Sequence, residues 1–305
     1  MKPKSDCIAC LVERTKYECD MVFNDDREKI RVLKEFIAFL LEHLGEEGKS
    51  PAFFGTERER IIKRRSGAKD PHGKVKKRSN EVAKGLLPEV YKFYDAVSSK
   101  SKIEALIRIA AAANSMEYGV KGYSYDDDVF KGDFVHTLNE KLNWDMDLII
   151  SAIKERDEIL YLTDNAGEIF FDAFVIRELI EMGKEVVVSP KSAPVINDAT
   201  TEDLKEAIAN VSPNFGFGDR VKVTPSGSCI GVSLEEAEEE FLSVFSDAKY
   251  LVIAKGMGNY EAISEFEATP ELGLKGRLIY ILRAKCEPIA SSIGVRRREL
   301  VAKLV

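Results

Sequence analysis

Short apolar runs alternate with helix-length segments over the second half of this chain, and that alternation restricts the fold more than any other feature. Strand composition occurs over residues 158–163, 184–189, 220–224, 250–254 and 277–282. Helical patterns occur over 168–182, 201–209 and 233–245, the last opened by Ser233 and Glu236 at capping-box spacing. Alternating strands and helices build a parallel sheet with helices on both faces. We therefore predict an α/β fold, a Rossmann-like α/β/α sandwich with a parallel-rich sheet.

The first half of the chain has a helical period instead. Apolar residues recur every three or four positions over 30–44, which is the pattern of an amphipathic helix that ends before Pro51. Further helices are predicted over 56–66, 80–97 and 101–118. A chain of 305 residues is long enough for two domains. We predict an N-terminal helical domain over residues 1–153 and a Rossmann-like α/β domain over residues 154–305.

Charge and hydropathy argue against several classes of protein. The net charge of −7 disfavours a dedicated nucleic-acid binder, which would carry an excess of lysine and arginine. No apolar run approaches the roughly 20 residues that a membrane-spanning helix needs, and the first residues lead into no signal-peptide pattern. We therefore expect a cytoplasmic protein without nucleic-acid or membrane partners. No feature of the sequence specifies an oligomeric state.

The chain has five cysteines, and an odd number in a chain expected to be cytoplasmic argues against a disulfide framework. Cys7 and Cys10 have the C-x-x-C spacing of metal and redox sites, but no second such pair accompanies them. Two interpretations stay open, reduced structural thiols or a metal or redox role. Cys286 lies next to the candidate residue Lys285, so a cluster of three cysteines is also compatible with the sequence.

Polar segments follow the predicted strands, and ligands of open parallel sheets bind beyond the carboxyl ends of strands. Asp164, Asn165 and Glu168 follow the first strand. Carboxylate and amide oxygens suit a divalent metal ion such as Mg or Mn. Gly167 permits a tight turn into the next helix, whose N-terminus favours an anion. The alternative is that Asp164 or Asn165 only caps this helix.

Two further polar segments follow the second and third strands. Asp198 could supply a second carboxylate to the same metal, or it could cap the helix that begins near Thr201. Ser226 lies in a Pro-Ser-Gly-Ser segment whose hydroxyl and amide groups could donate to an oxyanion, although the segment could also be a plain loop.

A glycine-rich segment follows the fourth strand. Gly256 and Gly258 would allow backbone amides to approach a ligand closely, with charge from Lys255, an amide from Asn259, and Met257 between the glycines. The spacing is neither that of a Walker loop nor that of a dinucleotide-binding fingerprint. A simple glycine-rich turn is the alternative.

Two isolated residues complete the candidate set. Lys285 follows the fifth strand and could neutralise a transferring phosphoryl group, or it could be a surface lysine. Asn114 interrupts an alanine-rich helical stretch of the first half. It is either a buried amide with satisfied hydrogen bonds or a contribution from the helical domain to the same cleft.

The motifs Asp-Asn-Ala-Gly-Glu at 164–168 and Lys-Gly-Met-Gly-Asn-Tyr-Glu at 255–261, together with Lys285, resemble the damage-control phosphatase family. This family is also called domain of unknown function 89 or ARMT-like, and the C-x-x-C pair resembles its archaeal and bacterial branch. The resemblance implies a helical domain packed on a Rossmann-like, metal- and phosphate-binding domain. It also implies a divalent metal ion (Mg, Mn, Co or Ni) and a small phosphorylated metabolite as substrate.

The resemblance also assigns roles to individual residues. The metal ligands would be Asp164, Asn165 and Asp198, and Asp198 is the least distinctive match. The substrate-binding residues would be Asn114, Ser226, Lys255, Gly256, Met257, Gly258 and Asn259, together with Lys285. The catalytic residues would be Asp164, Glu168 and Lys285.

The expected reaction is hydrolysis of a small phosphomonoester, such as a sugar phosphate or a damaged phosphometabolite. Asp164 or Glu168 would orient a water molecule activated by the metal, or Asp164 would form a covalent aspartyl phosphate. An S-adenosylmethionine-dependent carboxyl methyltransferase is one rival, because such enzymes also place a turn and an acidic residue on a Rossmann-like sheet. A non-catalytic metal- or nucleotide-binding protein is the other.

Overall fold

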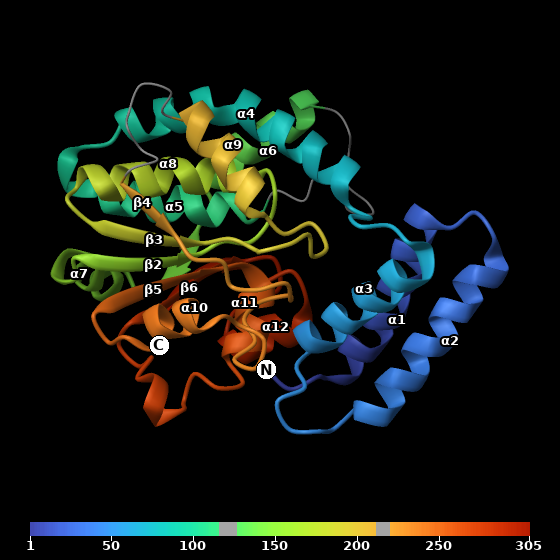
Figure 1. Ribbon diagram of the computed structural model, residues 1–305. Helices are drawn as coiled ribbons and strands as arrows, with labels where there is room; N and C mark the ends of the chain where they lie inside the picture. Colours follow the sequence, from blue (N-terminus) through green and yellow to red (C-terminus); the bar gives the residue numbers. More distant parts are fainter. Residues whose placement is uncertain (116–126, 212–219) are drawn as a thin grey trace.

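The computed structural model describes residues 1–115, 127–211 and 220–305. Its strands form one sheet, and helices cover both faces (Figure 1). The strands are β1 (Leu142–Trp144), β2 (Glu158–Leu162), β3 (Glu185–Ser189), β4 (Val221–Val223), β5 (Tyr250–Lys255), β6 (Leu278–Arg283) and β7 (Leu300–Leu304). The helices of the first half are α1 (Ser5–Val22), α2 (Asp26–His43), α3 (Pro51–Ser66), α4 (Gly73–Asp95), η1 (Ser99–Ser101), α5 (Lys102–Ala113) and α6 (Asp127–Leu138). Those that follow are α7 (Met146–Glu155), α8 (Glu168–Glu181), α9 (Thr201–Val211), α10 (Glu239–Ser246), α11 (Gly256–Ile263), η3 (Pro270–Leu272) and α12 (Glu287–Ile293).

The sheet has the strand order β1-β7-β6-β5-β2-β3-β4 and is parallel except where β7 pairs with β6. Along β2, Ile159 and Tyr161 enter the core beneath α4, α5 and α8, whereas Leu160 and Leu162 enter the core beneath α10, α11 and α12. This alternation places apolar side chains on both faces of the strand, as a doubly covered sheet requires. The predicted α/β/α sandwich with a parallel-rich sheet is confirmed.

All five predicted strands are present, as β2 to β6. The predicted capping box is wrong, because α10 begins at Glu239 and Glu236 instead pairs with Arg60 of α3. Residues 116–118 of the helix expected over 101–118 lie outside the described residues. Pro51 was expected to mark the end of the helix predicted over 30–44. It is also the first residue of α3, and Ser50 caps that helix.

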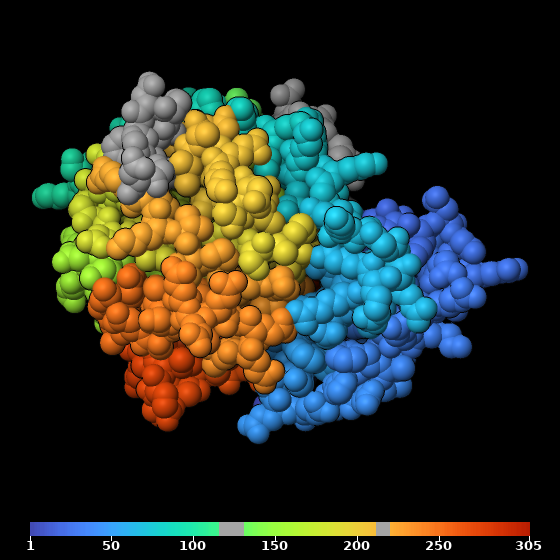
Figure 2. Space-filling model, in the orientation of Figure 1, coloured from blue at the N-terminus to red at the C-terminus, as the bar shows by residue number. Residues whose placement is uncertain are grey.

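Helices α1, α2 and α3 share a core of their own and form a lobe at one side of the sheet (Figure 1). In the space-filling view this lobe protrudes from the body of the molecule (Figure 2). Helix α3 packs against α11 and α1 packs against α12, so the lobe faces one edge of the sheet. Helices α4 and α5 belong to the core of the sheet instead. The predicted domain boundary between residues 153 and 154 stays a prediction. Of the helices α1 to α5, only α1, α2 and α3 pack in a core separate from that of the sheet.

The described helices include none with the length and apolar character needed to cross a bilayer.

Candidate active site

The candidate site lies between β2 and β5, where the connections between strands begin to run to opposite sides of the sheet. From β2 the chain moves through α8 to β3 on one side, and from β5 it moves through α11 to β6 on the other. Strands β2 and β5 are neighbours and parallel, so their carboxyl ends form a crevice of the kind in which open α/β sheets bind ligands. Asp164 follows β2 and Gly256 follows β5, which brings two of the predicted segments together.

Three predicted metal ligands converge at this crevice. Asn165 and Asp198 form an antiparallel bridge, and the amide of Ala199 donates to the backbone oxygen of Asp164 at 2.7 Å. The side chains of all three ligands are buried. Gly256 has a φ of +78°, and a Cβ at this position would lie 1.9 Å from Oδ2 of Asp164. The glycine is therefore required both by its backbone conformation and by the close approach of the carboxylate.

Amide groups join the carboxylates of the site. Asn114 Nδ2 donates to Asp164 Oδ2 at 2.8 Å and to both Glu168 oxygens at 3.1 and 3.2 Å. Asn165 Nδ2 donates to the same Asp164 oxygen at 2.6 Å and to Glu168 Oε2 at 3.1 Å. The backbone amide of Arg283 donates to Asn114 Oδ1 at 3.0 Å, which fixes this side chain at the end of β6. Asn114 is fully buried, so it bridges the carboxylates from behind the crevice.

Lys255 lies beneath the site and not on its surface. Its ammonium group is fully buried, 2.5 Å from Glu168 Oε1 and 2.6 Å from Asp172 Oδ1. Tyr161 also donates to that Asp172 oxygen at 2.6 Å. The structure thus gives Lys255 two carboxylate partners and holds Glu168 in place, because a buried charge requires compensation.

A cavity of about 230 Å³ opens at the crevice, between the sheet and the helical lobe. The predicted residues that line it are Asp164, Asn165, Asp198, Met257, Gly258 and Lys285. The predicted residues that do not line it are Asn114, Glu168, Ser226, Lys255, Gly256 and Asn259. Asn259 supports the loop by donating to the backbone oxygens of Thr163 and Lys255. Ser226 accepts from Lys191, whose ammonium lies 4.0 Å from Asp198.

Sequence reasoning missed several residues of this region. Arg58 of α3 lines the cavity and forms a bidentate pair with Glu18 at 2.7 and 2.8 Å. Lys191 is buried beside Asp198, and Ile230 lines the cavity from the loop before α10. Glu261 lines it too, and its place in the 255–261 motif was a signal that could have identified it. No local pattern marks the others, because the tertiary fold alone brings them to the site.

The electrostatics of the site fit a divalent cation. Burial, reinforced by the nearby charge of Glu168, raises the pKa of Asp164 to about 7. Burial also raises the pKa of Asp198 well above its usual range, with Lys191 opposing. A cation between two such carboxylates would favour their ionised forms, and oxygen donors suit Mg and similar ions. The residues present therefore fit a metal.

A metal held between Asp164 and Asp198 would take a third protein donor from the amide of Asn165. Within the described ranges, no three His, Cys, Asp or Glu side chains are grouped so as to hold a metal by themselves. Asn165 Oδ1 accepts from Asn197 Nδ2 at 2.7 Å, and its Nδ2 faces Asp164. A half-turn of the Asn165 amide would direct its oxygen toward the carboxylates, where it could serve as a ligand.

Three free cysteines line the same cavity, namely Cys7 and Cys10 of α1 and Cys286 before α12. Burial raises the pKa of all three thiols, that of Cys286 to about 11. Because the thiolate is the nucleophile and the metal-binding form, raised pKa values make these side chains weak nucleophiles at neutral pH. All three side chains form part of the cavity wall.

A model of the Damage-control phosphatase ARMT1-like domain matches residues 4–301. The chain belongs to this family. An uncharacterized protein of Methanocaldococcus jannaschii is 33% identical over 97% of this chain and 93% of its own length. A damage-control phosphatase of Archaeoglobus fulgidus is 30% identical over the full length of both chains. The crystal structure of a DUF89 family protein from Pyrococcus horikoshii has a TM-score of 0.83 and 28% identity, covering 99% of this chain and 98% of that one.

Family membership establishes the class of enzyme. The chain is a phosphatase of the damage-control family, and its relatives in Archaeoglobus fulgidus and Pyrococcus horikoshii are named damage-control phosphatases. The expected phosphatase activity is thereby confirmed at the level of the family, and methyl transfer is not favoured. The match spans both the helical lobe and the sheet, so the resemblance seen in the two motifs extends to the whole chain.

Proposed function

We propose that this chain hydrolyses small phosphomonoesters, sugar phosphates or damaged phosphometabolites, in the cavity at the carboxyl ends of β2 and β5. The observation that carries the proposal is the convergence of Asp164, Asn165 and Asp198 at the point where the crossovers change direction, with Lys285 on the same cavity. Two carboxylates and an amide provide oxygen ligands for a divalent metal (Mg, Mn, Co or Ni). When bound, the metal would stabilise charge on the phosphoryl oxygens as a Lewis acid.

The phosphoryl group would be held by Lys285 and by the start of α11. Lys285 lies near enough to Asp164 for its charge to oppose the rise in the pKa of that carboxyl. The first amides of a helix have no partner within the helix and carry partial positive charge. Met257 and Gly258 occupy the first turn of α11 and line the cavity, so their amides are suited to the equatorial phosphoryl oxygens.

Asp164 is better placed than Glu168 to act on the nucleophile. Asp164 lines the cavity, whereas Glu168 lies behind it in an ion pair with Lys255. Asp164 would therefore orient the attacking water and accept its proton as the new O–P bond forms, and the ester O–P bond would break with the alcohol oxygen taking a proton from solvent. Direct attack by the Asp164 carboxylate on phosphorus is the alternative route. Each route consumes one phosphomonoester and one water molecule and releases one alcohol and one inorganic phosphate.

The first test is phosphate release from p-nitrophenyl phosphate and a panel of sugar phosphates, after EDTA treatment and readdition of each metal. We expect metal-specific release that Asp164→Asn and Lys285→Ala each reduce by about a hundredfold or more. Lys222→Ala is the matched control, because Lys222 is exposed on β4 and lies outside the cavity. Full activity in Asp164→Asn or Lys285→Ala would contradict the corresponding role.

The two routes differ in whether the enzyme itself becomes phosphorylated. Acid quenching during turnover, followed by peptide mass spectrometry, should find no phosphoryl adduct if Asp164 only orients water. An adduct on the peptide that contains Asp164 would instead establish the covalent route. Either result leaves the phosphatase assignment intact.

A further inference from the structure

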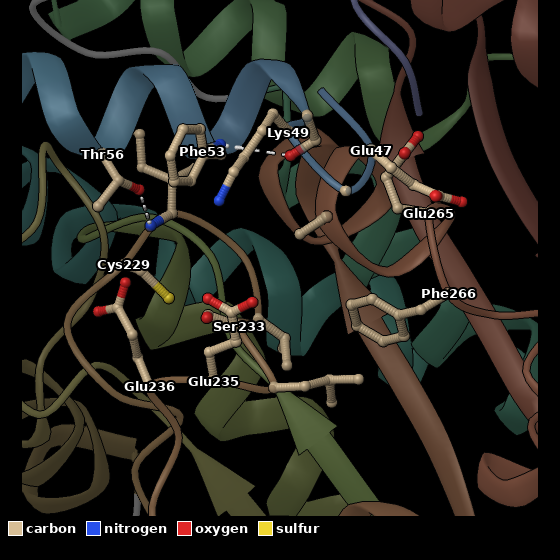
Figure 3. A pocket seen from close by; sticks show the side chains of 16 residues that line it. Glu47, Lys49, Phe53, Thr56, Cys229, Ser233, Glu235, Glu236, Glu265 and Phe266 are labelled. Carbon is tan, nitrogen blue, oxygen red and sulfur yellow. Dashed lines mark hydrogen bonds between the residues drawn. The ribbon is translucent and has the colours of Figure 1, made fainter. Parts of the chain in front are cut away.

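A second cavity, of about 210 Å³, lies beside the active-site cavity and is shown in Figure 3. It is formed between the start of α3, which contributes Phe53 and Thr56, and the segment before α10, which contributes Cys229 and Ser233 (Figure 3). Among the described residues, Ile230 alone belongs to the linings of both cavities. Its side chain therefore lies between the candidate active-site cavity and a second cavity that is partly open to solvent.

Two glycines make room for the Ile230 side chain. A Cβ on Gly55 of α3 would lie 2.9 Å from Ile230 Cδ1, and a Cβ on Gly258 of α11 would lie 2.8 Å from Ile230 Cγ2. Neither glycine has a positive φ, so backbone conformation does not account for them. A Cβ at either position would require the Ile230 side chain to shift, because real Cβ atoms essentially never come within 3.0 Å of another heavy atom. The isoleucine is thus held between the helical lobe and the phosphate-binding helix.

The backbone around Ile230 is fixed as well. Its amide donates to Thr56 Oγ1 at 2.9 Å, and that hydroxyl donates to the backbone oxygen of Ala52 at 2.9 Å. The next residue, Gly231, accepts from the buried Lys191 at 2.5 Å and has a φ of +70°. A Cβ at Gly231 would lie 2.4 Å from the backbone oxygen of Gly258, so the loop packs directly on α11. Ile230 cannot leave its place without breaking these contacts.

We propose that Ile230 is a specificity-determining residue that limits the length of the phosphomonoester. The inference rests on the proposed function, which places the phosphoryl group beside Asp164 and Lys285. The alcohol part of the substrate then extends toward α1, α3 and Ile230 within about 230 Å³. Beyond Ile230 the lining includes the apolar side chains of Phe53, Leu234 and Phe266. Shortening Ile230 joins the two cavities and admits an apolar chain that the native wall excludes.

The test compares ethyl phosphate with octyl phosphate, which have the same reacting group and differ only in chain length. In Ile230→Ala, we expect the ratio of kcat/KM for octyl over ethyl phosphate to rise by about tenfold or more relative to the native protein. Ile230→Val should give a smaller rise, because it removes a single methylene group. Leu234→Ala is the matched control, since Leu234 lines only the second cavity, and its ratio should stay at the native value.

Binding of ethyl- and octylphosphonate, which are not hydrolysed, gives a readout that does not depend on turnover. Ile230→Ala should gain affinity for octylphosphonate over ethylphosphonate by a similar factor. Unchanged ratios in Ile230→Ala, with ethyl phosphate still hydrolysed, would overturn the inference and leave the proposed function standing. A native protein that hydrolyses octyl phosphate as well as ethyl phosphate would overturn it too. Absence of turnover on every phosphomonoester would instead remove the proposed function on which the inference rests.

Discussion

Replacing Gly256 by alanine tests whether the Asp164 carboxylate must sit where the structure places it. The new Cβ would lie 1.9 Å from Asp164 Oδ2, whereas real Cβ atoms stay at least 3.0 Å from other heavy atoms. The carboxylate oxygen therefore has to retreat by about 1 Å, and a misplacement of that size costs about a hundredfold in rate. The same movement stretches the hydrogen bonds that Asn114 and Asn165 donate to this oxygen.

The substitution also imposes a backbone penalty that has to be separated from the clash. Alanine at a positive φ costs about 1–2 kcal/mol. Gly276 provides the control, because its φ is +76° against +78° for Gly256, and a Cβ there would meet nothing within 4 Å. Gly276→Ala should lose about 1 kcal/mol of unfolding free energy and keep its activity.

The assay measures urea unfolding, metal affinity and kcat/KM for both variants at saturating metal. We expect Gly256→Ala to lose at least as much stability as Gly276→Ala, to bind the metal more weakly, and to fall about a hundredfold in kcat/KM. A Gly256→Ala enzyme with kcat/KM and metal affinity close to those of Gly276→Ala would refute the reasoning. It would mean that the position of the Asp164 carboxylate is not critical for catalysis.

Three further substitutions probe the charges around the site, each by urea unfolding. Lys255→Met should cost about 3–5 kcal/mol, because it leaves the buried carboxylates of Glu168 and Asp172 without their cation; a loss below about 1 kcal/mol would contradict this. Tyr161→Phe should cost about 1.5–3 kcal/mol through the lost hydrogen bond to Asp172, and an unchanged stability would count against that bond. Burial raises the pKa of Glu261 from 4.5 to about 7, so the folded state binds this proton more tightly than the unfolded state does. Its stabilising effect is present in acid and is lost as the pH rises from about 4.5 through about 7, by at most about 3 kcal/mol. Glu261→Gln should flatten the dependence of the unfolding free energy on pH between about pH 4.5 and pH 7 in metal-free protein, and an unaltered slope would exclude Glu261 as its source.

Most of the sheet could be predicted from the sequence because its central strands are continuous apolar runs separated by helices. The edge formed by β1 and β7 could not. Strand β1 has three residues, and β7 runs antiparallel to β6 at the end of the chain, where no alternation with helices marks it. The capping box at Ser233 and Glu236 failed for a related reason. Glu236 forms an ion pair with Arg60 of the helical lobe, so a tertiary contact overrode the local signal.

The site residues also fall into those whose position the sequence predicts and those whose position it does not. Asp164 and Asn165 follow β2 almost directly, and Asp198 lies in the segment between β3 and α9, so their positions after neighbouring strands were enough to predict that they meet at one crevice. Lys255 has the same kind of position but points beneath the crevice into a buried ion pair, which depends on residues of another helix. Ile230 comes from a loop whose place is set by contacts with α3 and α11, and no spacing rule reaches that far.

The residues that line the active-site cavity come from two parts of the chain, the sheet and the helical lobe. The residues proposed for hydrolysis are thereby separated from others that could contact the rest of the substrate. Every residue assigned to the metal or the phosphoryl group follows a strand of the sheet, whereas Arg58 and the cysteines of the C-x-x-C pair belong to α1 and α3. Under the proposed function, we therefore expect substitutions in these two helices, like those at Ile230, to change the preferred phosphomonoester while the residues proposed for hydrolysis stay as they are.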